Sequence, residues 1–432
     1  MSDSVKAEEL AGVQAAVVEP AAAARMPGWR RALGVVVVPF LALFSGLVLS
    51  AFFVLGSDAA VLASYAKFFS DPGGALAITG RVIADAYGAL FIGALGDPAA
   101  IANAIRLFIA TGETRGLVLA FYPISESLVT ATPYIFAGLA VALGFKCGLF
   151  NIGAEGQIYI GAIVAAFVGN SITGLPWIIH MPLTFIAAAV GGMLWGGLPG
   201  FLKAKTGAHE VINTMMMNYV AFSLAHYLLN GPMKRGGAFG AIPISRNIEP
   251  SAYFPTFFPE PIRFHAGFIV ALLVAALVFW FLWKTTLGFE IRTVGSNPRA
   301  AQYAGISVTR SFILAMALSG ALAAMAGAGE VMGVNHNLAE GFSPGYGFDS
   351  IALALLGGGH PVGVVLAALL FGTLRNGATK MQSLAAIPID IISIVQAFVI
   401  MFVAAPAIIR WLYRIKARGG VGEAVFTRGW GG

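Results

Sequence analysis

Long apolar runs, separated by short polar segments, make up most of the chain after residue 32. A helix needs about 20 mainly apolar residues to cross the hydrocarbon core of a bilayer, so these runs predict transmembrane helices. Clear spans are expected at Leu33–Leu55, Ser127–Phe145, Gln157–Val168, Thr184–Leu202, Val211–Leu229, Gly267–Trp283, Phe312–Val331 and Ile389–Trp411. The pattern predicts an all-α integral membrane protein whose helices form a polytopic bundle.

Two further apolar runs, Phe348–Leu356 and Val362–Leu374, are each too short to cross a bilayer comfortably. The sequence GGGHP at 357–361 separates them, which predicts either a tightly turned hairpin or a pair of broken helices. We expect short or broken helices near 348–374 and also near 146–157, where NIGAEGQ interrupts the apolar pattern. Counting the two short runs as spans predicts about ten transmembrane helices.

Two long segments lie between predicted spans. Residues 56–126 contain weakly apolar stretches at Ala86–Leu95 and Ile101–Ile109, which are expected to lie on the outer leaflet or dip into it. One extra span there would reverse the side of every later loop. Residues 230–265 carry six prolines and several aromatic side chains, which predict an irregular periplasmic cap. Such a cap could receive a delivery protein or serve only as a structural lid.

Lysine and arginine gather in the loops on one face of the predicted bundle, and the positive-inside rule assigns that face to the cytoplasm. The residues concerned are Arg25, Arg30, Arg31, Lys146, Lys203, Lys205, Lys284, Arg292, Arg299, Arg310, Arg410, Arg414, Lys416 and Arg418. Both termini are therefore expected inside the cell. We predict a disordered cytoplasmic tail over 1–32, a transmembrane domain over 33–411 and a second cytoplasmic tail over 412–432.

The composition agrees with the membrane class, because only 11% of the residues are charged, against about 25% in soluble domains. The formal net charge of +6 comes from residues beside apolar runs, so it indicates membrane topology rather than a nucleic-acid partner. The single cysteine, Cys147, excludes an internal disulfide. Gly192, Gly196 and Gly200 recur every four residues, which predicts a helix contact face.

The chain has no recognisable motif for nucleotide binding or catalysis. It lacks G-x-x-x-x-G-K-[ST], H-E-x-x-H and G-x-S-x-G. The glycines at 327, 329 and 333 are similar to a dinucleotide loop, but they lie inside an apolar span, where helix packing explains them better. We expect no enzymatic activity, bound cofactor or metal site in this chain.

Carboxylates near the spans would be required for proton or sodium coupling. They fall near predicted span ends, and they form no row along a single helix: Glu126, Glu155, Glu210, Glu330, Asp349 and Asp390. This distribution argues against a self-sufficient secondary transporter.

A short helix is predicted inside the long cytoplasmic loop over 284–310. Asn297 is a good N-cap, Pro298 suits the first helical position, and Gly305 can adopt the left-handed conformation that ends a helix. A helix of about two turns is marginal by itself. It is therefore either a connector lying flat on the membrane or a rigid element that another protein engages, and the pattern favours neither.

Several segments in order resemble one family. GFEIRTVGSNPRAAQYAGI at 288–306 looks like the cytoplasmic signature of the branched-chain amino acid, ribose and nucleoside ABC permeases. ATPYIFAGLAVALGFKCGLFNIGAEGQIYIGA at 131–162, LKAKTGAHEVINTMMMNYVA at 202–221, SGALAAMAGAGEVMG at 319–333 and GFDSIALALLGGGHPVGVVLAALLFG at 347–372 also resemble it. The forms GLFNIGAEGQ and EVINTMMMNY are most similar to the longer permease of nucleoside and simple-sugar importers. The stretch 107–125 looks longer than usual for the family.

The resemblance implies a permease subunit in the bacterial inner membrane, embedded in lipid. It also implies a second permease, a cytoplasmic ABC ATPase that hydrolyses ATP, and a periplasmic or lipid-anchored solute-binding protein. The solute would be a nucleoside or simple sugar. A branched-chain amino acid permease and an ion-coupled secondary transporter are the alternatives. The ATPase-coupling residues would be Gly288, Glu290, Arg292, Gly295, Asn297, Pro298, Arg299, Ala301, Tyr303 and Gly305.

The translocation path is expected near the interruption of the apolar pattern at 151–157. Irregular backbone at membrane depth persists only where protein or a water-filled cavity satisfies it, and half-helix ends commonly line transport sites. The candidate path residues are Asn151, Glu155, Gln157, Asn213 and Asn218. The competing interpretation is a turn whose polar groups only hold the fold, and for Glu155 that interpretation is slightly favoured.

Overall fold

The structure is a computed structural model. It describes residues 28–237 and 242–385, together with 387, 393–394, 397–398, 401–402 and 405–414. Part of the predicted span Ile389–Trp411, including the carboxylate Asp390, lies outside these described residues, as do the tails up to residue 27 and beyond residue 414. The chain divides into two compact units, a larger one formed by Ala51–Ile394 and a smaller one formed by the segments on either side.

In the smaller unit, a hydroxyl contact joins the two segments. The Ser45 Oγ, on α2 (Gly28–Ser57), lies 3.0 Å from the Tyr413 OH, which follows α17 (Pro406–Leu412).

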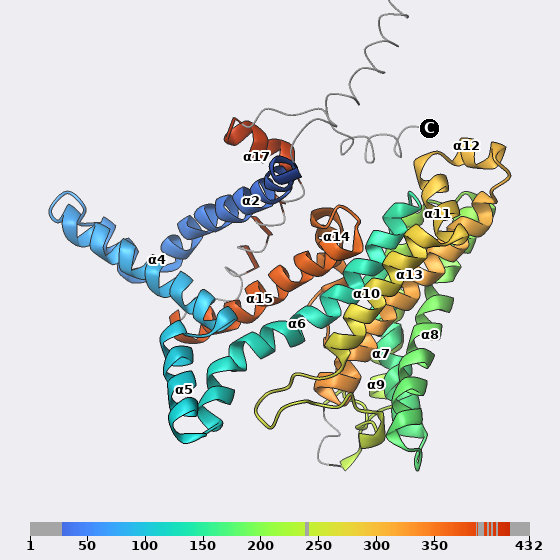
Figure 1. The fold of residues 1–432 in the computed structure, drawn as a ribbon, viewed down its shortest axis with the longest axis horizontal. Helices are drawn as coiled ribbons and strands as arrows, with labels where there is room; N and C mark the ends of the chain where they lie inside the picture. The colour runs from blue at the N-terminus through green and yellow to red at the C-terminus, as the bar shows by residue number, and fades with distance from the viewer. Residues whose placement is uncertain are drawn as a thin grey trace, which may run out of the picture. The chain divides into compact units, whose positions relative to one another are not determined.

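The described residues form helices joined by loops, and no β-strand is found among them (Figure 1). Helices form over the predicted spans: α6 (Arg115–Lys146), α7 (Ala154–Ser171), α8 (Trp177–Thr206), α9 (Glu210–Asn230), α10 (Gly267–Lys284) and α13 (Val308–Glu330). Seven described segments are long and apolar enough to cross a bilayer: Phe40–Ser57, Pro72–Thr111, Arg115–Lys146, Trp177–Thr206, Gly267–Lys284, Val308–Asn335 and Pro361–Ala385. These segments support a polytopic membrane protein, while the total of about ten spans stays a prediction.

The segment before α6 is more helical than its weakly apolar stretches predicted. It forms α3 (Ala59–Tyr65), α4 (Pro72–Leu95) and α5 (Pro98–Thr111), and Pro72–Thr111 is one of the seven candidate spans. Asp71 starts α4 because its carboxylate accepts a hydrogen bond of 2.8 Å from the Gly74 N–H. The predicted stretch Ala86–Leu95 is therefore only the last part of a 24-residue helix.

The two apolar runs around GGGHP form helices of unequal length. The first is α14 (Tyr346–Leu356), which is short as expected. The second is α15 (Pro361–Ala385), so the prediction that Val362–Leu374 is too short to cross a bilayer was wrong. The polar residue Asn376 is tolerated within this helix because its side-chain amide is satisfied. The amide donates to the Gly93 and Pro123 carbonyl oxygens, at 3.0 and 2.9 Å.

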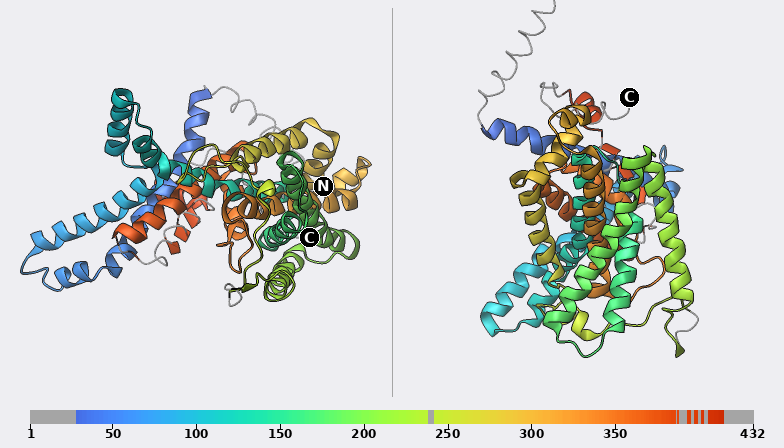
Figure 2. Two further views of the ribbon diagram at one scale, coloured as in Figure 1. Left: turned by 90° about the horizontal axis from the view of Figure 1, so that it is seen from below. Right: turned by 90° about the vertical axis from the view of Figure 1, so that its right-hand side faces the viewer.

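Helix α13 packs against α6, α7 and α8 in the centre of the larger unit (Figures 1 and 2). The predicted glycine face is confirmed: a Cβ on Gly196 would lie 2.6 Å from the Met316 carbonyl oxygen of α13. Gly327 packs in the same way against α7, where a Cβ would lie 2.9 Å from the Ala162 backbone nitrogen. Close approach of helix backbones holds this core together.

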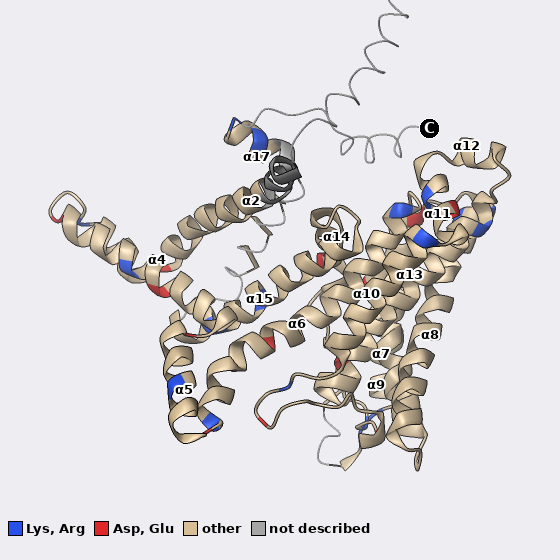
Figure 3. Ribbon diagram, viewed as in Figure 1, with Lys and Arg blue, Asp and Glu red and all other residues tan. Residues whose placement is uncertain are grey.

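Basic side chains gather at one end of the larger unit, around α11 (Thr286–Ser296) and α12 (Pro298–Tyr303) (Figure 3). Helices α6, α8 and α10 each end there with lysine in their last turn. Within the larger unit, the structure thus brings together the basic loops that follow α6, α8 and α10. The assignment of this face to the cytoplasm stays a prediction.

An irregular segment at 242–266, here called the strap, lies against the linker between α13 and α14. The Ser245 N–H donates to the Leu338 carbonyl oxygen at 2.8 Å, and the Phe254 N–H donates to the Met332 carbonyl oxygen at 2.9 Å. The Arg263 side chain forms an ion pair with Glu126 on α6. The irregular form agrees with the prolines of this segment, and its periplasmic position stays a prediction.

Candidate functional site

Six polar side chains from five helices surround the N-terminus of α14. They are named here the α14 cluster: Tyr134 on α6, Glu155 on α7, Glu330 on α13, Tyr346 and Asp349 on α14, and Arg375 on α15. These side chains can meet because α14 begins inside the bundle. The helix starts directly after Gly345, which has a φ of 101°, a conformation that only glycine adopts readily. The N–H groups of its first turn therefore need partners from other helices.

Glu155 supplies one of these partners. Its Oε2 accepts a hydrogen bond of 2.6 Å from the Gly347 N–H in the first turn of α14, and the side chain is buried. A carboxylate at a helix N-terminus is favoured by the helix dipole as well as by the hydrogen bond. Gly347 is required for this approach, because a Cβ there would lie 2.5 Å from the Glu155 Cα.

Asp349, Tyr134 and Arg375 form a second set of contacts. The Tyr134 OH donates to Asp349 Oδ2 at 2.8 Å and accepts a hydrogen bond from Arg375 Nη1 at 3.2 Å. Arg375 Nη1 also lies 3.6 Å from Asp349 Oδ2. The aspartate and arginine side chains remain 24% and 29% exposed, respectively. This ion pair between α14 and α15 is thus partly accessible at the surface of the chain.

Glu330 is the least satisfied member of the cluster. It is buried, and its two partners are distant: the Tyr346 OH lies 3.5 Å from Oε1 and the Asn335 amide nitrogen 3.4 Å from Oε2. These separations exceed those of ordinary hydrogen bonds between such groups. A poorly paired carboxylate inside a membrane bundle is costly, which marks it as a functional candidate.

The cluster combines several kinds of hydrogen-bonding group, although Tyr134, Glu155, Glu330 and Tyr346 are buried. Its carboxylates accept hydrogen bonds, Arg375 donates them, and the tyrosine hydroxyls do both. The rings of Tyr134 and Tyr346 meet edge to face, with centroids 4.9 Å apart. The cluster therefore offers donors, acceptors and aromatic edges close to one another.

Three of the predicted path residues lie in a different group, here called the α7 network: Asn151, Gln157, Asn218 and Ser319. All four side chains are buried. The Asn151 amide donates to Gln157 Oε1 and to Ser319 Oγ, each at 2.8 Å, and Ser319 donates to the Ala140 carbonyl oxygen at 2.6 Å. Their hydrogen-bonding groups are directed at one another and at the backbone.

Asn218 has the same character. Its Oδ1 accepts a hydrogen bond of 2.8 Å from the Gly156 N–H, and its Nδ2 donates to the Ile152 carbonyl oxygen at 3.0 Å. It thereby caps the start of α7 from α9. Asn213 is only half-buried, and its amide nitrogen has no partner among the described residues. Of the five predicted path residues, Glu155 alone belongs to the α14 cluster.

Sequence reasoning did not single out Tyr134, Tyr346 or Arg375. It noted Glu330 and Asp349 as carboxylates near span ends, whereas the structure brings them together with Glu155. One sequence feature could have indicated this site: the apolar run Phe348–Leu356 is too short to cross a bilayer. A helix that begins inside a membrane bundle has free N–H groups at its start, and these need polar partners from neighbouring helices.

The predicted coupling helix is α12, and its capping is as expected. Asn297 Oδ1 accepts a hydrogen bond of 3.0 Å from the Ala300 N–H, Pro298 is the first helical residue, and Gly305 has a φ of 80°. The Tyr303 side chain is 95% exposed and that of Arg299 is also exposed, whereas Ala301 is buried. A well-anchored helix therefore presents exposed side chains at the charged end.

The residues before α12 form a second helix, α11, which the sequence reasoning did not predict. Thr285 caps it through the Gly288 N–H at 3.1 Å, and Gly288 packs against the end of α10, where a Cβ would lie 2.7 Å from the Leu282 Cα. Arg292 Nε donates to the Leu282 carbonyl oxygen at 2.9 Å. Gly295 packs against the end of α6. Helix α11, which leads directly into α12, is thus packed against the ends of α6 and α10.

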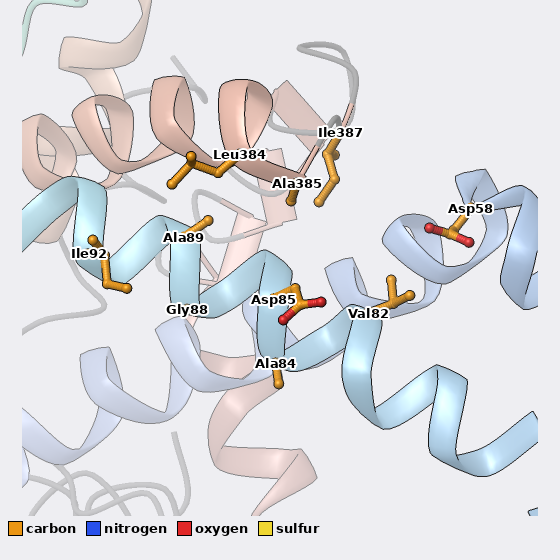
Figure 4. Close-up of a pocket in the computed structure, with 10 residues that line it drawn as sticks. All are labelled: Asp58, Val82, Ala84, Asp85, Gly88, Ala89, Ile92, Leu384, Ala385 and Ile387. Carbon is orange, nitrogen blue, oxygen red and sulfur yellow. The ribbon is translucent and has the colours of Figure 1, made fainter. Parts of the chain in front are cut away.

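A hollow of about 570 Å³ lies elsewhere in the larger unit, between α4 and the end of α15 (Figure 4). Its lining includes the carboxylates of Asp58 and Asp85 among mostly apolar residues. Asp58 caps α3 through the Ala60 and Val61 N–H groups, at 2.8 and 3.0 Å. The hollow lacks the paired donors and acceptors of the α14 cluster.

Residues 124–404 match the profile of the family described as branched-chain amino acid transport system / permease component. The chain belongs to this family. The matched region of the permease contains the α14 cluster and the coupling helix, whereas α3, α4 and α5 precede it.

Three similar proteins are permeases of ABC transporters. The guanosine ABC transporter permease protein NupP of Bacillus subtilis is 43% identical over 71% of this chain and 88% of its own length. The glucose permease TsgB13 of Haloferax volcanii is 39% identical over 65% of this chain and 76% of its own. The nucleoside permease NupB of Lactococcus lactis is 36% identical over 66% and 80%. No solved structure matches the chain.

Proposed function

We propose that this permease forms part of the translocation path of an ATP-driven importer for nucleosides or simple sugars. The choice of solute rests on relatives that are named for guanosine, glucose and nucleosides. They are at least 36% identical to this chain over about two thirds of its length. The α14 cluster supports it, because its mixture of donors, acceptors and aromatic edges suits an uncharged solute rich in hydroxyl groups.

The path would run along the exposed side of Asp349 and Arg375. A charge that faces hydrocarbon costs several kcal/mol, so ionisable residues in membrane bundles face the interior, a water-filled cavity or one another. We therefore place a second permease opposite this surface, with the path between the two subunits. In this proposal Asn151, Gln157 and Asn218 support the path from behind by fixing the start of α7, and only Glu155 borders it. The Asn213 amide nitrogen forms no hydrogen bond with either group.

The driving force would come from a cytoplasmic ABC ATPase that engages α12. Tyr303 and Arg299 are exposed for such a contact, and α11 links them to the ends of α6 and α10. Movement of α12 would then shift α6, which carries Tyr134 of the cluster. A solute-binding protein would deliver the solute on the opposite side, at the strap.

The proposed topology follows from the charged end of the larger unit. With that end in the cytoplasm of a bacterial cell, both termini lie inside, the coupling loop 284–310 is cytoplasmic, and the segments 56–126 and 230–265 are periplasmic. Helices α4 and α5 would then enter the membrane and return to the same side, with their turn at Gly96. This arrangement accommodates the long candidate span Pro72–Thr111 without reversing any later loop.

Reconstitution tests the function. Proteoliposomes that hold this permease, its partner permease, the ATPase and the solute-binding protein should accumulate labelled guanosine only when ATP is supplied. Excess nucleoside should compete, whereas excess leucine should not. Accumulation by this permease alone under an ion gradient would overturn the proposal, and competition by leucine but not by nucleosides would replace the proposed solute with a branched-chain amino acid.

Two charge reversals test the coupling helix. Arg299→Glu on α12 should weaken co-purification of the ATPase and lower uptake, while membrane insertion stays normal. Arg310→Glu is the matched control, because Arg310 is exposed at the same end but lies outside α12. Equal effects of the two substitutions on ATPase binding would contradict a specific role for α12.

A further inference from the structure

Two cations and two further rings surround Trp283 at the charged end of the larger unit. Lys146 Nζ and Arg292 Cζ each lie 5.7 Å from the centroid of the Trp283 ring. The His360 and Phe279 rings pack on the same tryptophan, with centroids 5.0 and 5.3 Å away. These five residues, named here the basic–aromatic cluster, come from α6, α10, α11 and the turn between α14 and α15.

Neither Lys146 nor Arg292 forms an ion pair in the described part of the chain. The ion pairs found there are Lys203–Glu210, His226–Glu340, Arg263–Glu126 and Arg375–Asp349. Arg292 uses its Nε to bind a backbone carbonyl, which leaves the two terminal nitrogens of its guanidinium group for another partner. Burial and the nearby charge of Lys146 lower the pKa of His360. The two half-buried cations therefore have no carboxylate within ion-pair distance among the described residues.

The position of the cluster indicates the depth at which that anion would lie. Large apolar side chains are exposed along one face of α10 at helical spacing: Ile269, Leu273, Leu277 and Trp280. This row ends one turn before Trp283 and Lys284, the last residues of the helix. Tryptophan at the end of an apolar span marks the level of lipid headgroups. Lys146 and Arg292 thus lie at the boundary between the apolar face of α10, which would contact lipid acyl chains, and the basic end of the larger unit.

We propose that the basic–aromatic cluster binds the headgroup phosphate of an anionic phospholipid. Arg292 would hold two phosphate oxygens through its terminal nitrogens, Lys146 would add a point charge, and the acyl chains would follow the apolar row on α10. Guanidinium groups suit bidentate contact with phosphate, and basic pockets between membrane helices hold anionic headgroups. This inference does not depend on which solute the permease carries.

Native mass spectrometry of the purified permease tests the proposal. The protein is titrated with phosphatidylglycerol, with phosphatidylethanolamine and with inorganic phosphate, and the bound fraction of each is measured. Phosphatidylglycerol should bind preferentially, and Lys146→Gln should weaken it about fivefold, as expected for the loss of one basic residue near a headgroup. The double variant Lys146→Gln/Arg292→Gln should lose more, whereas Lys146→Arg should retain binding.

Lys205→Gln is the matched control, because Lys205 is an exposed lysine in the last turn of α8 and has no aromatic neighbour in the cluster. It should leave phosphatidylglycerol binding unchanged. Equal loss in Lys146→Gln and Lys205→Gln would reduce the effect to net charge and overturn the proposal. Binding of inorganic phosphate with the same affinity would indicate a free-anion site. Loss of the lipid from the assembled importer would indicate a protein interface instead.

Discussion

The α14 cluster and the α7 network are both polar groups inside the larger unit, yet they differ in how their hydrogen bonds are met. In the α7 network, Asn151, Gln157 and Ser319 are buried and bind one another or the backbone at 2.6–3.2 Å. In the α14 cluster, Glu330 has only distant partners, and the Asp349–Arg375 pair is partly exposed. Satisfied polar groups hold helices together, whereas unsatisfied or accessible ones are available to a solute.

The largest effect should come from breaking the α7 network. Asn151→Leu removes the two hydrogen bonds that the Asn151 amide nitrogen donates and the one that its oxygen accepts from Gln157. The buried Gln157 amide is left without these partners, which should destabilise the fold by about 3 kcal/mol. Thermal unfolding of the purified protein, followed by size-exclusion chromatography, measures the loss. Asn213→Leu is the control, because the Asn213 amide nitrogen has no partner to lose. A stable Asn151→Leu protein that fails only in transport would assign Asn151 to the path.

His265, in the strap, has one ring nitrogen that is hydrogen-bonded and one that is not. Its Nδ1 accepts a hydrogen bond of 3.1 Å from the Gly267 N–H, but its buried Nε2 has no partner among the described residues. Burial, and then the charges of His336 and Arg263, lower the pKa of His265 to about 4.

Because the unfolded chain binds a proton near pH 6.5 and the folded chain does not, stability should fall as pH drops from about 6.5 to 4, by about 2 kcal/mol at pH 5. Unfolding temperatures measured at pH 7 and pH 5 should show this difference. His265→Gln should make it smaller. An unchanged pH dependence in that variant would show that another group titrates.

Within the α14 cluster, Asp349→Asn should lower uptake about tenfold, a change of about 1.4 kcal/mol, with little change in unfolding temperature. The amide can still accept the hydrogen bond from Tyr134, but it cannot balance the charge of Arg375. Uptake and thermal unfolding are measured on the same preparation. Normal uptake combined with a destabilised fold would make the ion pair structural.

The smallest change in stability is expected for Glu330→Gln. The amide has the same shape and removes a buried charge that is poorly paired, so unfolding should be unchanged or shifted upward by up to about 1 kcal/mol. Uptake should nevertheless fall, because a solute would lose a charged acceptor. Destabilisation comparable to that of Asn151→Leu would remove the distinction between the two groups.

Much of the helical framework could be predicted from apolar runs, because length and hydropathy determine which segments can cross a bilayer. Local spacing also predicted two further features. These are the helix contact face at Gly192, Gly196 and Gly200, and the capping of α12. The full extents of α4 and α15 were not predicted, because polar residues interrupt the apolar run inside each helix. Asn376 is an example: its amide is satisfied by carbonyl groups of Gly93 and Pro123.

The α14 cluster could be predicted only in part. Tyr134 and Arg375 touch although they are 241 positions apart in the chain, and no local pattern indicates that contact. Sequence reasoning instead favoured the polar residues at the interruption 151–157, because irregular backbone there needs partners. Those partners turned out to be mostly one another. Polarity at membrane depth identified both groups, but only three-dimensional contacts could separate them.

The strap has a mechanical consequence for the cluster. Its backbone is tied to the linker that runs from α13 into α14, through the Ser245–Leu338 and Phe254–Met332 hydrogen bonds. That linker ends at Gly345, immediately before the helix that carries Tyr346 and Asp349. A displacement of the strap would therefore be transmitted to the peptide that enters α14, and through it to the Asp349–Arg375 ion pair.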